Sequence, residues 1–396
     1  MSRRSLLKGA LTGAAGLATA VLGTGAASRP DDVHSAAARS FCSYLPGLAG
    51  DGAGQAPAFG ANGLRAAANA RGLTIGGLPS YPPFFQPVVP PAYTQLLVNQ
   101  FNLLGTGLGW PSQRPVQPDG YWQLPYRSFD TFLAFAAGTG QRTRCTALFW
   151  GDRAHLPAWL IGSSYSRADL VRIVQDRAQA VVGHYAGRVH EWVAVNEAFH
   201  ISTGDFWADA IGADYPQIVF ESVRAADPAA KLIYNDYGNE VAGAAQDRDV
   251  TEISKLQTGG LVDAAGLQMH VSAKVAPTPA ALSASIERFH DAGVDVLMTE
   301  CDVNMRGVAG PPSDRLASQA AVYRSIFAVV RDSRYCHSIT VQNPGDQYSW
   351  LELAPAPPFG GPDAIPTMWD DDLTPKPAYF AVLESLKREP PRCSLP

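Results

Sequence analysis

The chain has 396 residues, 46% of them hydrophobic, so it exceeds a minimal single domain and has enough apolar side chains for a sizeable core. Its formal net charge is −5, and its lysines and arginines are scattered rather than gathered on one face. This balance gives no reason to expect nucleic acid or an anionic lipid surface as a partner.

The N-terminal segment has the composition of a targeting signal. Arg3 and Arg4 precede a run of Gly, Ala and Leu from residue 9 to residue 27. The segment resembles a twin-arginine export signal, so we expect a signal peptide at 1–28, a linker at 29–58, and export to the periplasm or beyond. A membrane anchor is the alternative, which the low hydrophobicity of the run disfavours.

From about residue 59 onward, short apolar or β-branched runs alternate with longer segments in which apolar residues recur at a spacing of three and four. The eight runs are Leu73–Gly76, Gln100–Leu104, Arg144–Trp150, Glu191–Asn196, Lys231–Asn235, Ala264–Met269, Val294–Thr299 and Ser338–Gln342. Strands that alternate with helices pair in parallel through crossover connections. Eight such units predict an α/β fold, a single-domain (β/α)8 TIM barrel, over residues 59–390.

An open, doubly wound sheet is the structural alternative to a closed barrel. Such sheets often bind a nucleotide at a Gly-rich turn, and the Gly-rich stretch Gly105–Gly109 follows a predicted strand. This stretch lacks the GxGxxG spacing, and no acidic residue ends a strand at the usual distance. We therefore predict no nucleotide site. Independently of this stretch, we expect no metal or organic cofactor, because the chemistry proposed below needs none.

The sequence contains five cysteines, none of them in a CxxC pair, so structural zinc and thioredoxin-type chemistry are not expected. Cys145 and Cys301 lie in strand-like runs and are predicted to be buried apolar side chains. Cys42 and Cys393 lie near opposite ends of the mature chain. Because barrel termini often meet and export permits disulfides, these two could form one.

Two glutamates directly follow predicted strands, at the end of the barrel where such enzymes keep their working residues. Glu197 follows the fourth run and Glu300 the seventh. A carboxylate at the end of a buried strand is costly unless it is paired or used. Two carboxylates across a cleft suit glycosidic cleavage, which needs one acid protonated and the other ionised. The alternative is that each glutamate pairs with an arginine on the barrel rim.

Six short motifs resemble, in order, those of the family 10 glycoside hydrolases, which are chiefly endo-β-1,4-xylanases. They are WVAVNEAF at 192–199, LIYNDY at 232–237, GLQMH at 266–270, TECDV at 299–303, DQYSW at 346–350 and DDDLTPKPAY at 370–379. The similarity extends from about Arg71 to Leu386. Any one motif is short, but their joint order is specific to the family.

The resemblance implies a retaining hydrolase in which Glu197 is the general acid/base and Glu300 the nucleophile. It places Asn196 against the 2-hydroxyl of the sugar being cleaved. It also implies that His270 hydrogen-bonds Glu300 with Asp302 behind it, which keeps the nucleophile oriented and ionised.

The resemblance further implies a β-linked polysaccharide or oligosaccharide as substrate, such as xylan or a relative of it. We expect the enzyme to be a monomer. Gln268 and Tyr237 are expected to border the cleft. Trp150 and Trp350 are expected to stack on the apolar faces of the sugar. Trp159 matches the LPxW of the family and is expected to serve packing rather than binding.

The sequence departs from the family in the residues that grip sugars on the non-reducing side of the cleaved bond. The second strand of the family supplies Glu-Asn and then Lys-Trp, where this chain has GTGLGW at 105–110. HTLVWH becomes TALFWG at 146–151, and TVWG becomes TVQN at 340–343. We therefore hypothesise that these subsites accept something other than plain xylan. The candidates for new contacts are Arg114, Asp152, Arg153 and His155.

The alternative function is a catalytically weak carbohydrate-binding protein on the same barrel. The retention of Glu197 and Glu300 argues against it, because unused acids at strand ends are costly. A metal hydrolase or a serine hydrolase is disfavoured, because the sequence contains neither HExxH nor GxSxG.

Overall fold

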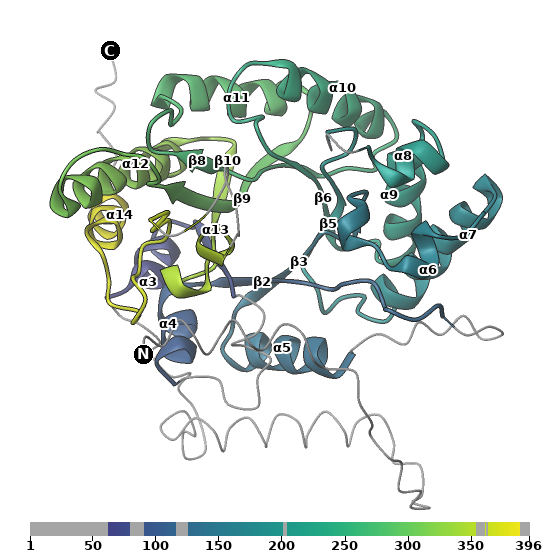
Figure 1. The fold of residues 1–396 in the computed structure, drawn as a ribbon, viewed down its shortest axis with the longest axis horizontal. Coiled ribbons are helices and arrows are strands. Elements are labelled where there is room, and N and C mark those ends of the chain that lie inside the picture. Colours follow the sequence, from purple (N-terminus) through teal and green to yellow (C-terminus); the bar gives the residue numbers. More distant parts are fainter. Residues whose placement is uncertain are drawn as a thin grey trace, which may run out of the picture.

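The computed structural model describes residues 62–79, 91–115, 126–200, 204–353, 361 and 363–388 (Figure 1). Eight parallel strands form a ring: β1 Thr74–Leu78, β2 Leu103–Gly107, β3 Arg142–Thr146, β5 Glu191–Asn196, β6 Lys231–Asp236, β7 Ala264–Leu267, β9 Asp295–Asn304 and β10 Cys336–Gln342. The first strand pairs with the last, from Thr74 beside Ser338 to Leu78 beside Gln342. This pairing closes the sheet, so the predicted barrel is confirmed and the open sheet is excluded.

Helices surround the strands (Figure 1). The α-helices are α3 Leu64–Asn69, α4 Pro91–Gln100, α5 Tyr126–Gly138, α6 Ala158–Ile161, α7 Arg167–Arg177, α8 Phe206–Ala210, α9 Tyr215–Ala226, α10 Ala244–Thr258, α11 Pro279–Asp291, α12 Pro312–Asp332, α13 Trp350–Leu353 and α14 Pro377–Lys387. Two short strands, β4 Phe149–Trp150 and β8 His270–Ser272, and three helical turns, η1 Arg153–His155, η2 Ala178–Val182 and η3 Asp346–Tyr348, complete the described elements. Within the described ranges, no helix has the length and apolar character that crossing a bilayer requires.

Local sequence signals explain where several helices begin. Ser166 and Asp169 form a reciprocal capping box at the start of α7. Thr278 accepts a hydrogen bond from Ala281 at the start of α11, and Pro279 follows it in the first turn. These caps satisfy backbone donors that a helix start would otherwise leave unpaired.

The barrel interior is packed with side chains. One buried apolar cluster contains a residue from each of four neighbouring strands, β5, β6, β7 and β9: Val193, Ile233, Ala264 and Leu297. Lower in the barrel, the buried Arg144 of β3 forms an ion pair of 2.7 Å with the buried Glu191. Arg144 also donates to Thr340 of β10 at 2.9 Å. Because β3 and β10 are not neighbours in the ring, the guanidinium crosses the interior and links distant strands.

Several predicted strand boundaries differ from the structure: β9, for example, continues past the predicted end at Thr299 to Asn304, and two of the differences have a clear local cause. The second strand covers 103–107 instead of 100–104, because Gln100 ends α4 and the Asn102 side chain bonds back to Ile75 and Leu73. The third predicted run is two strands, because Ala147 has a φ of +55° and breaks the extended chain between β3 and β4.

The predicted burial of Cys145 and Cys301 is confirmed, and Cys336 is buried as well. The predicted signal peptide at 1–28, the linker at 29–58 and the Cys42–Cys393 disulfide lie outside the described residues.

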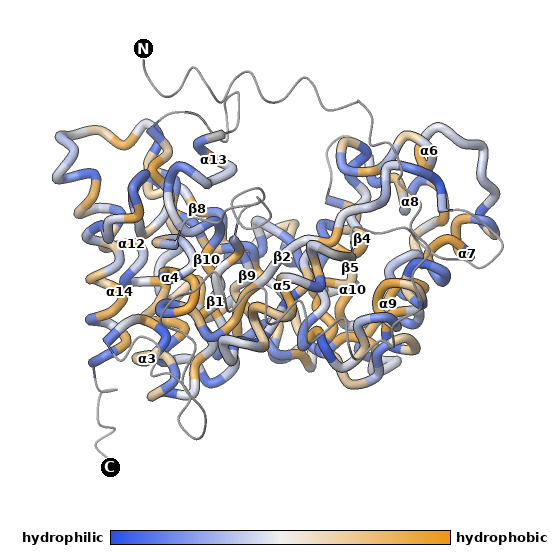
Figure 2. Tube along the Cα trace, turned by 90° about the horizontal axis from the view of Figure 1, so that it is seen from below, coloured by the Kyte–Doolittle hydropathy of each residue, from blue (hydrophilic) through white to orange (hydrophobic). Residues whose placement is uncertain are grey.

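One end of the barrel carries unusual backbone geometry. Four residues other than glycine adopt positive φ where a strand ends: Ala147 after β3, Glu197 after β5, Met269 after β7 and Asn343 after β10. In Figure 2, α6 and α8 rise on one side of this end of the molecule and α13 rises on the other. Strained backbone at several strand ends is a common mark of a functional site.

Candidate active site

Glu197 directly follows β5 and is held between two donors. Its Oε1 accepts a hydrogen bond of 2.9 Å from the Gln268 amide, and its Oε2 accepts one of 2.9 Å from the Trp150 indole. Its φ of +56° lies in the left-handed region that disfavours residues with a side chain. The fold therefore holds this carboxyl in one orientation at a backbone cost.

The surroundings of Glu197 favour its protonated form. Burial is the largest cause that raises the pKa of this carboxyl, and the negative charges of Asp236 and Glu300 raise it further. The hydrogen bonds from Gln268 and Trp150 act in the opposite direction but do not cancel the rise. A carboxyl with a raised pKa suits a proton donor.

Glu300 lies in β9 and is 16% exposed. Its Oε1 accepts a hydrogen bond of 3.0 Å from the Asn235 amide, and its Oε2 lies 3.6 Å from Nε2 of His270. On the other side of the imidazole, Nδ1 lies 3.0 Å from Oδ2 of the buried Asp302. Glu300 thus faces a histidine that a second carboxylate supports, the arrangement that the family resemblance implies, although 3.6 Å is longer than the hydrogen bond expected there.

The charge on His270 follows from these two carboxylates. Burial by itself lowers the pKa of the imidazole, but Asp302 and Glu300 outweigh burial and hold that pKa well above its ordinary value. Both carboxylates therefore favour the protonated imidazole over the neutral one. The imidazole thus lies between the two carboxylates, with Nε2 toward Glu300 and Nδ1 toward Asp302, an arrangement that orients the proposed nucleophile.

A chain of amide hydrogen bonds joins the two glutamates. Gln268 donates to Glu197 at 2.9 Å and also lies 3.4 Å from Oδ1 of Asn196. Asn235 donates to the same Asn196 oxygen at 2.7 Å and to Glu300 at 3.0 Å. The predicted residues Asn196 and Gln268 therefore lie between the two acids, at one mouth of the barrel.

The predicted aromatic residues reach the same mouth. The Trp150 ring stacks on the His155 ring with centroids 4.0 Å apart. Trp350 donates from its indole to Asp302 at 3.0 Å, and the residue is 37% exposed. The Tyr237 ring stacks on the His200 ring with centroids 3.9 Å apart. Burial is the largest cause that raises the pKa of the Tyr237 phenol, and the charge of Glu197 is the next.

Sequence reasoning missed Asn235 as a site residue, although it lies in the recognised LIYNDY motif. The parallel register places Asn235 of β6 directly beside Asn196 of β5. A polar residue in register with a predicted site residue on the next strand was the available signal. Thr299 fixes the other end of the Asn235 amide by donating to its Oδ1 at 2.6 Å.

The glycine at position 151 has a direct structural reason. A Cβ atom on Gly151 would lie 1.9 Å from Oδ1 of Asp205, so no larger residue fits there. Asp205 is itself fixed, because it caps α8 and accepts a hydrogen bond of 2.6 Å from Tyr215. A buried carboxylate from a later loop thus occupies the space that a histidine would need.

The four residues predicted to provide new substrate contacts have different partners in the structure. Arg153 pairs with Asp209 at 3.0 Å. Asp152 caps η1 and lies 3.0 Å from His155, and Arg114 lies over the Tyr165 ring. Among these four, the contacts place His155 against a predicted site residue, because it stacks on Trp150.

Trp110 and Trp159 belong to a packed aromatic cluster. Trp110 lies beneath the buried guanidinium of Arg177 at 4.0 Å, and its ring lies 5.4 Å from that of Trp207. Trp159 is partly buried against the core and donates to the Pro111 carbonyl at 3.0 Å. The expected packing role of Trp159 is confirmed, and the retained Trp110 shares it.

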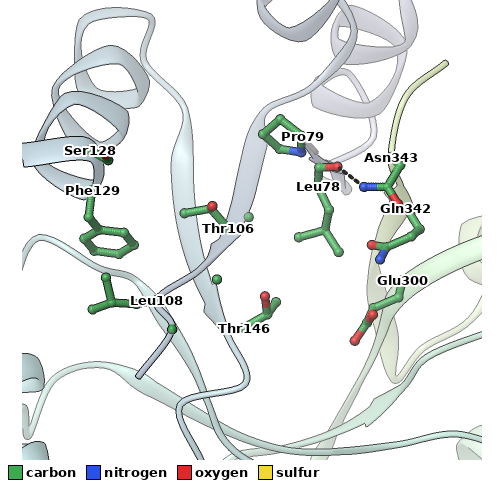
Figure 3. A pocket seen from close by; sticks show the side chains of 13 residues that line it. Leu78, Pro79, Thr106, Leu108, Ser128, Phe129, Thr146, Glu300, Gln342 and Asn343 are labelled. Carbon is green, nitrogen blue, oxygen red and sulfur yellow. Dashed lines mark hydrogen bonds between the residues drawn. The ribbon is translucent and has the colours of Figure 1, made fainter. Parts of the chain in front are cut away.

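A pocket of about 460 Å³ opens beside Glu300 (Figure 3). Its wall contains Gly105, Gly107 and Gly109, and its remaining lining residues are Leu78, Pro79, Thr106, Leu108, Ser128, Phe129, Thr146, Gln342 and Asn343. Glu300 is the only ionisable side chain among the described residues that line it. Leu78 lies across Gly105, where a Cβ atom would come within 2.2 Å of it.

Gln342 supplies an unused polar atom to this pocket. Its buried Oε1 accepts no hydrogen bond from the described residues. In Figure 3 the Gln342 side chain lies next to Glu300. An unpaired buried acceptor at that position suits a hydroxyl group of a bound ligand.

Comparison with known proteins identifies one family. Residues 63–385 match the model of glycosyl hydrolase family 10. Endo-1,4-beta-xylanase 5 of Pyricularia oryzae is 33% identical over 267 residues, which are 66% of this chain and 63% of that protein. This chain thus spans somewhat less than two thirds of that relative. Endo-1,4-beta-xylanase A of Fusarium oxysporum is 30% identical over 74% of this chain and 90% of its own length.

Solved structures agree with this family. Native xylanase 10B from Thermotoga maritima superimposes with a TM-score of 0.73 at 27% identity, over 82% of this chain and 98% of that one. Xylanase 10B from Thermotoga petrophila, solved with xylobiose, gives a TM-score of 0.73 at 25% identity, over 85% and 99% of the two chains.

Proposed function

The chain belongs to glycosyl hydrolase family 10, and on this premise we propose that it is a retaining glycoside hydrolase that cleaves β-1,4 bonds in xylan or a related plant polysaccharide. The observation that carries the proposal is the contrast between two linked carboxyls. The pKa of Glu197 is raised, whereas Glu300 faces His270, whose own pKa is held well above its ordinary value. One acid is thus suited to donate a proton and the other to attack as an anion.

In the first step, an oxygen of Glu300 forms a bond to the anomeric carbon while the bond from that carbon to the glycosidic oxygen breaks. The carboxyl proton of Glu197 passes to the departing oxygen. The products are a glycosyl ester on Glu300, an ionised Glu197 and a free chain end with a new hydroxyl group.

In the second step, Glu197 takes a proton from a water molecule. The water oxygen attacks the anomeric carbon, and the bond to Glu300 breaks. Two inversions leave the anomeric configuration unchanged, which requires the two carboxyls to be about 5–5.5 Å apart.

The neighbouring side chains supply orientation. Asn196 uses its Oδ1 for the bonds from Asn235 and Gln268, which fixes its amide hydrogens for the 2-hydroxyl of the sugar. Hydrogen bonds to that hydroxyl strengthen in the transition state. The exposed face of Trp350 offers a surface for the apolar C–H face of the ring.

We propose that the pocket beside Glu300 receives the non-reducing part of the substrate. The sugar that is attacked lies over Glu300, and the leaving group lies toward Glu197. Glu300 lines this pocket and Glu197 does not, which supports the glycone side. Because the described lining carries no cation, the pocket suits a neutral sugar, and its glycine wall leaves room for a bulkier unit than plain xylose.

Hydrolysis of a panel of β-glycans, with the first-formed anomer read by proton NMR, tests the proposal. We expect the β-anomer first and a substituted or branched xylan, or another neutral β-glycan, as the preferred substrate. A first-formed α-anomer contradicts the mechanism. Unsubstituted xylan as much the best substrate contradicts the glycone assignment alone. Sugar binding without turnover of an aryl β-glycoside favours the carbohydrate-binding alternative.

For the remainder of the chain, we propose a twin-arginine-type signal at 1–28, a linker at 29–58 and a monomeric catalytic barrel at 59–390. The double arginine at positions 3 and 4 supports the export route. Replacing both arginines by lysine should retain the precursor inside the cell, which fractionation and mass determination of the exported protein would detect.

A further inference from the structure

A second histidine–carboxylate pair lies beside Glu197, and the mechanism above does not use it. Nδ1 of His200 lies 2.7 Å from Oδ1 of Asp236. Asp236 is fully buried, and the His200 side chain is 20% exposed. The arrangement parallels His270 and Asp302 beside Glu300, where the corresponding distance is 3.0 Å.

The backbone ties this second pair to the acid/base residue. The His200 amide donates to the Glu197 carbonyl at 3.2 Å, and the Glu197 amide donates to the carbonyl of Asn235, directly before Asp236. Tyr237 fixes the imidazole plane, because its ring stacks on His200 at 3.9 Å with an interplanar angle of 12°. The histidine ring therefore has one orientation, with Nδ1 directed at Asp236.

The charged groups around Asp236 come from two elements. Nη2 of Arg248, on α10, lies 3.2 Å from Oδ2 of Asp236, and Nε of Arg248 lies 3.5 Å from Asp249. Burial and then the charge of Asp236 raise the pKa of Asp249 to about 9, so Asp249 is neutral near pH 7. Among the described residues, the side chains of His200, Arg248 and Asp249 thus all contact Asp236.

We propose that His200 is a positioning residue for the general acid/base, which sets through its hydrogen bond to Asp236 how much negative charge Glu197 experiences. The proposal rests on the role of Glu197 given above. A donor on Asp236 draws its charge away from Glu197, and a protonated His200 draws away more than a neutral one.

The direction of the effect follows from the charges. Asp236 raises the pKa of Glu197 after burial, so removal of the Asp236 charge lowers that pKa. Removal of the His200 donor leaves more of the Asp236 charge uncompensated and raises it. Opposite shifts from the two members of one hydrogen-bonded pair are not expected from a purely structural role.

The test is the alkaline limb of kcat/KM on a xylo-oligosaccharide, whose leaving group needs a proton from Glu197. Relative to the parent enzyme, Asp236→Asn should move this limb to lower pH and His200→Phe to higher pH, each by about one unit or less. His200→Asn, whose amide can replace Nδ1, should restore the parent limb. The double variant that combines His200→Phe with Asp236→Asn should have the same alkaline limb as Asp236→Asn alone.

His290→Phe is the matched control. His290 stacks on Tyr335 at 3.7 Å and 10°, nearly as His200 stacks on Tyr237, but it lies at the end of α11, where the chain approaches the amino end of β9. Its replacement should leave the limb unchanged. If Asp236→Asn does not fold, the comparison of His200→Phe with His200→Asn still tests the proposal. The inference is overturned if the alkaline limb of kcat/KM does not move in His200→Phe. It is also overturned if His200→Phe and Asp236→Asn move the limb in the same direction. Loss of retention in the parent enzyme instead contradicts the proposed function.

Discussion

The side-chain amide of Asn235 donates a hydrogen bond of 3.0 Å to Oε1 of Glu300, although the two residues are 65 positions apart. Asn235 ends β6 and Glu300 lies in β9, two strands along the ring. The same amide holds Asn196 at 2.7 Å. One uncharged side chain thus orients the proposed nucleophile and the residue that we propose to contact the 2-hydroxyl.

Asn235→Ala should lower kcat/KM about ten- to a hundredfold, because a hydrogen bond to a charged group contributes about 1.5–3 kcal/mol. The loss should appear in kcat more than in KM, since orientation of the nucleophile matters most in the transition state. Steady-state kinetics on an aryl β-xyloside measure the split. Unchanged kinetics would show that Glu300 is oriented by other contacts.

Glu197→Gln should stabilise the fold at neutral pH and less so in acid. The pKa of Glu197 is raised on folding, so its carboxyl contributes stability below the ordinary value of 4.5, and this contribution is lost as pH rises through the folded pKa. Denaturant unfolding at pH 4 and pH 7 measures the change.

Glu384→Gln on α14 is the control for this pH experiment. The hydrogen bond from Arg388 lowers the pKa of Glu384, so its substitution should remove a small stabilisation at neutral pH, the opposite sign. A gain for Glu197→Gln that does not grow between pH 4 and pH 7 would contradict the raised pKa.

Gly107→Leu should fill the pocket beside Glu300. A Cβ atom on Gly107 would meet its nearest neighbour, the Thr146 carbonyl, at 3.8 Å, so the backbone tolerates the change and the side chain enters the pocket. We expect a higher KM for long oligosaccharides and little change for an aryl monoxyloside. Gly138→Leu, in open space at the end of α5, is the control. Equal kinetics for both variants on long substrates would remove this pocket from the substrate path.

Glu197→Gly should be more stable than Glu197→Ala by about 0.5–1 kcal/mol, against the usual order. Both variants remove the carboxyl and differ only in tolerance of a φ of +56°. At Glu221, on the regular helix α9, Gly should instead be about 1 kcal/mol less stable than Ala. Thermal unfolding of the four variants measures both differences, and the same order at both positions would show that Glu197 is unstrained.

The periodic elements were predictable from the sequence. The run Glu191–Asn196 matches β5 residue for residue, because it is buried along its whole length and Glu197 then turns away. The pair Glu197 and Glu300 was also predictable, since each directly follows buried strand residues, although β9 continues past Glu300 to Asn304. Both predictions use signals local to one strand.

The parts that sequence reasoning missed depend on contacts between distant segments. The carboxylate of Asp205 occupies the space beside Gly151, and Leu78 lies across Gly105. Nothing in the local sequence shows which remote side chain fills the space beside a glycine. Asn235 was missed for a related reason, because its partners lie on neighbouring strands and its role follows from register rather than from periodicity.

The most direct test of the paired-acid mechanism is peptide mass mapping of Glu197→Ala after incubation with an aryl β-xylobioside that has a good leaving group. Without its acid/base, the variant should still form the glycosyl ester but release it slowly. We predict a mass increase of one disaccharide unit on Glu300 and no such adduct in Glu300→Ala. An adduct on a different residue, or steady turnover by Glu300→Ala, would contradict the account.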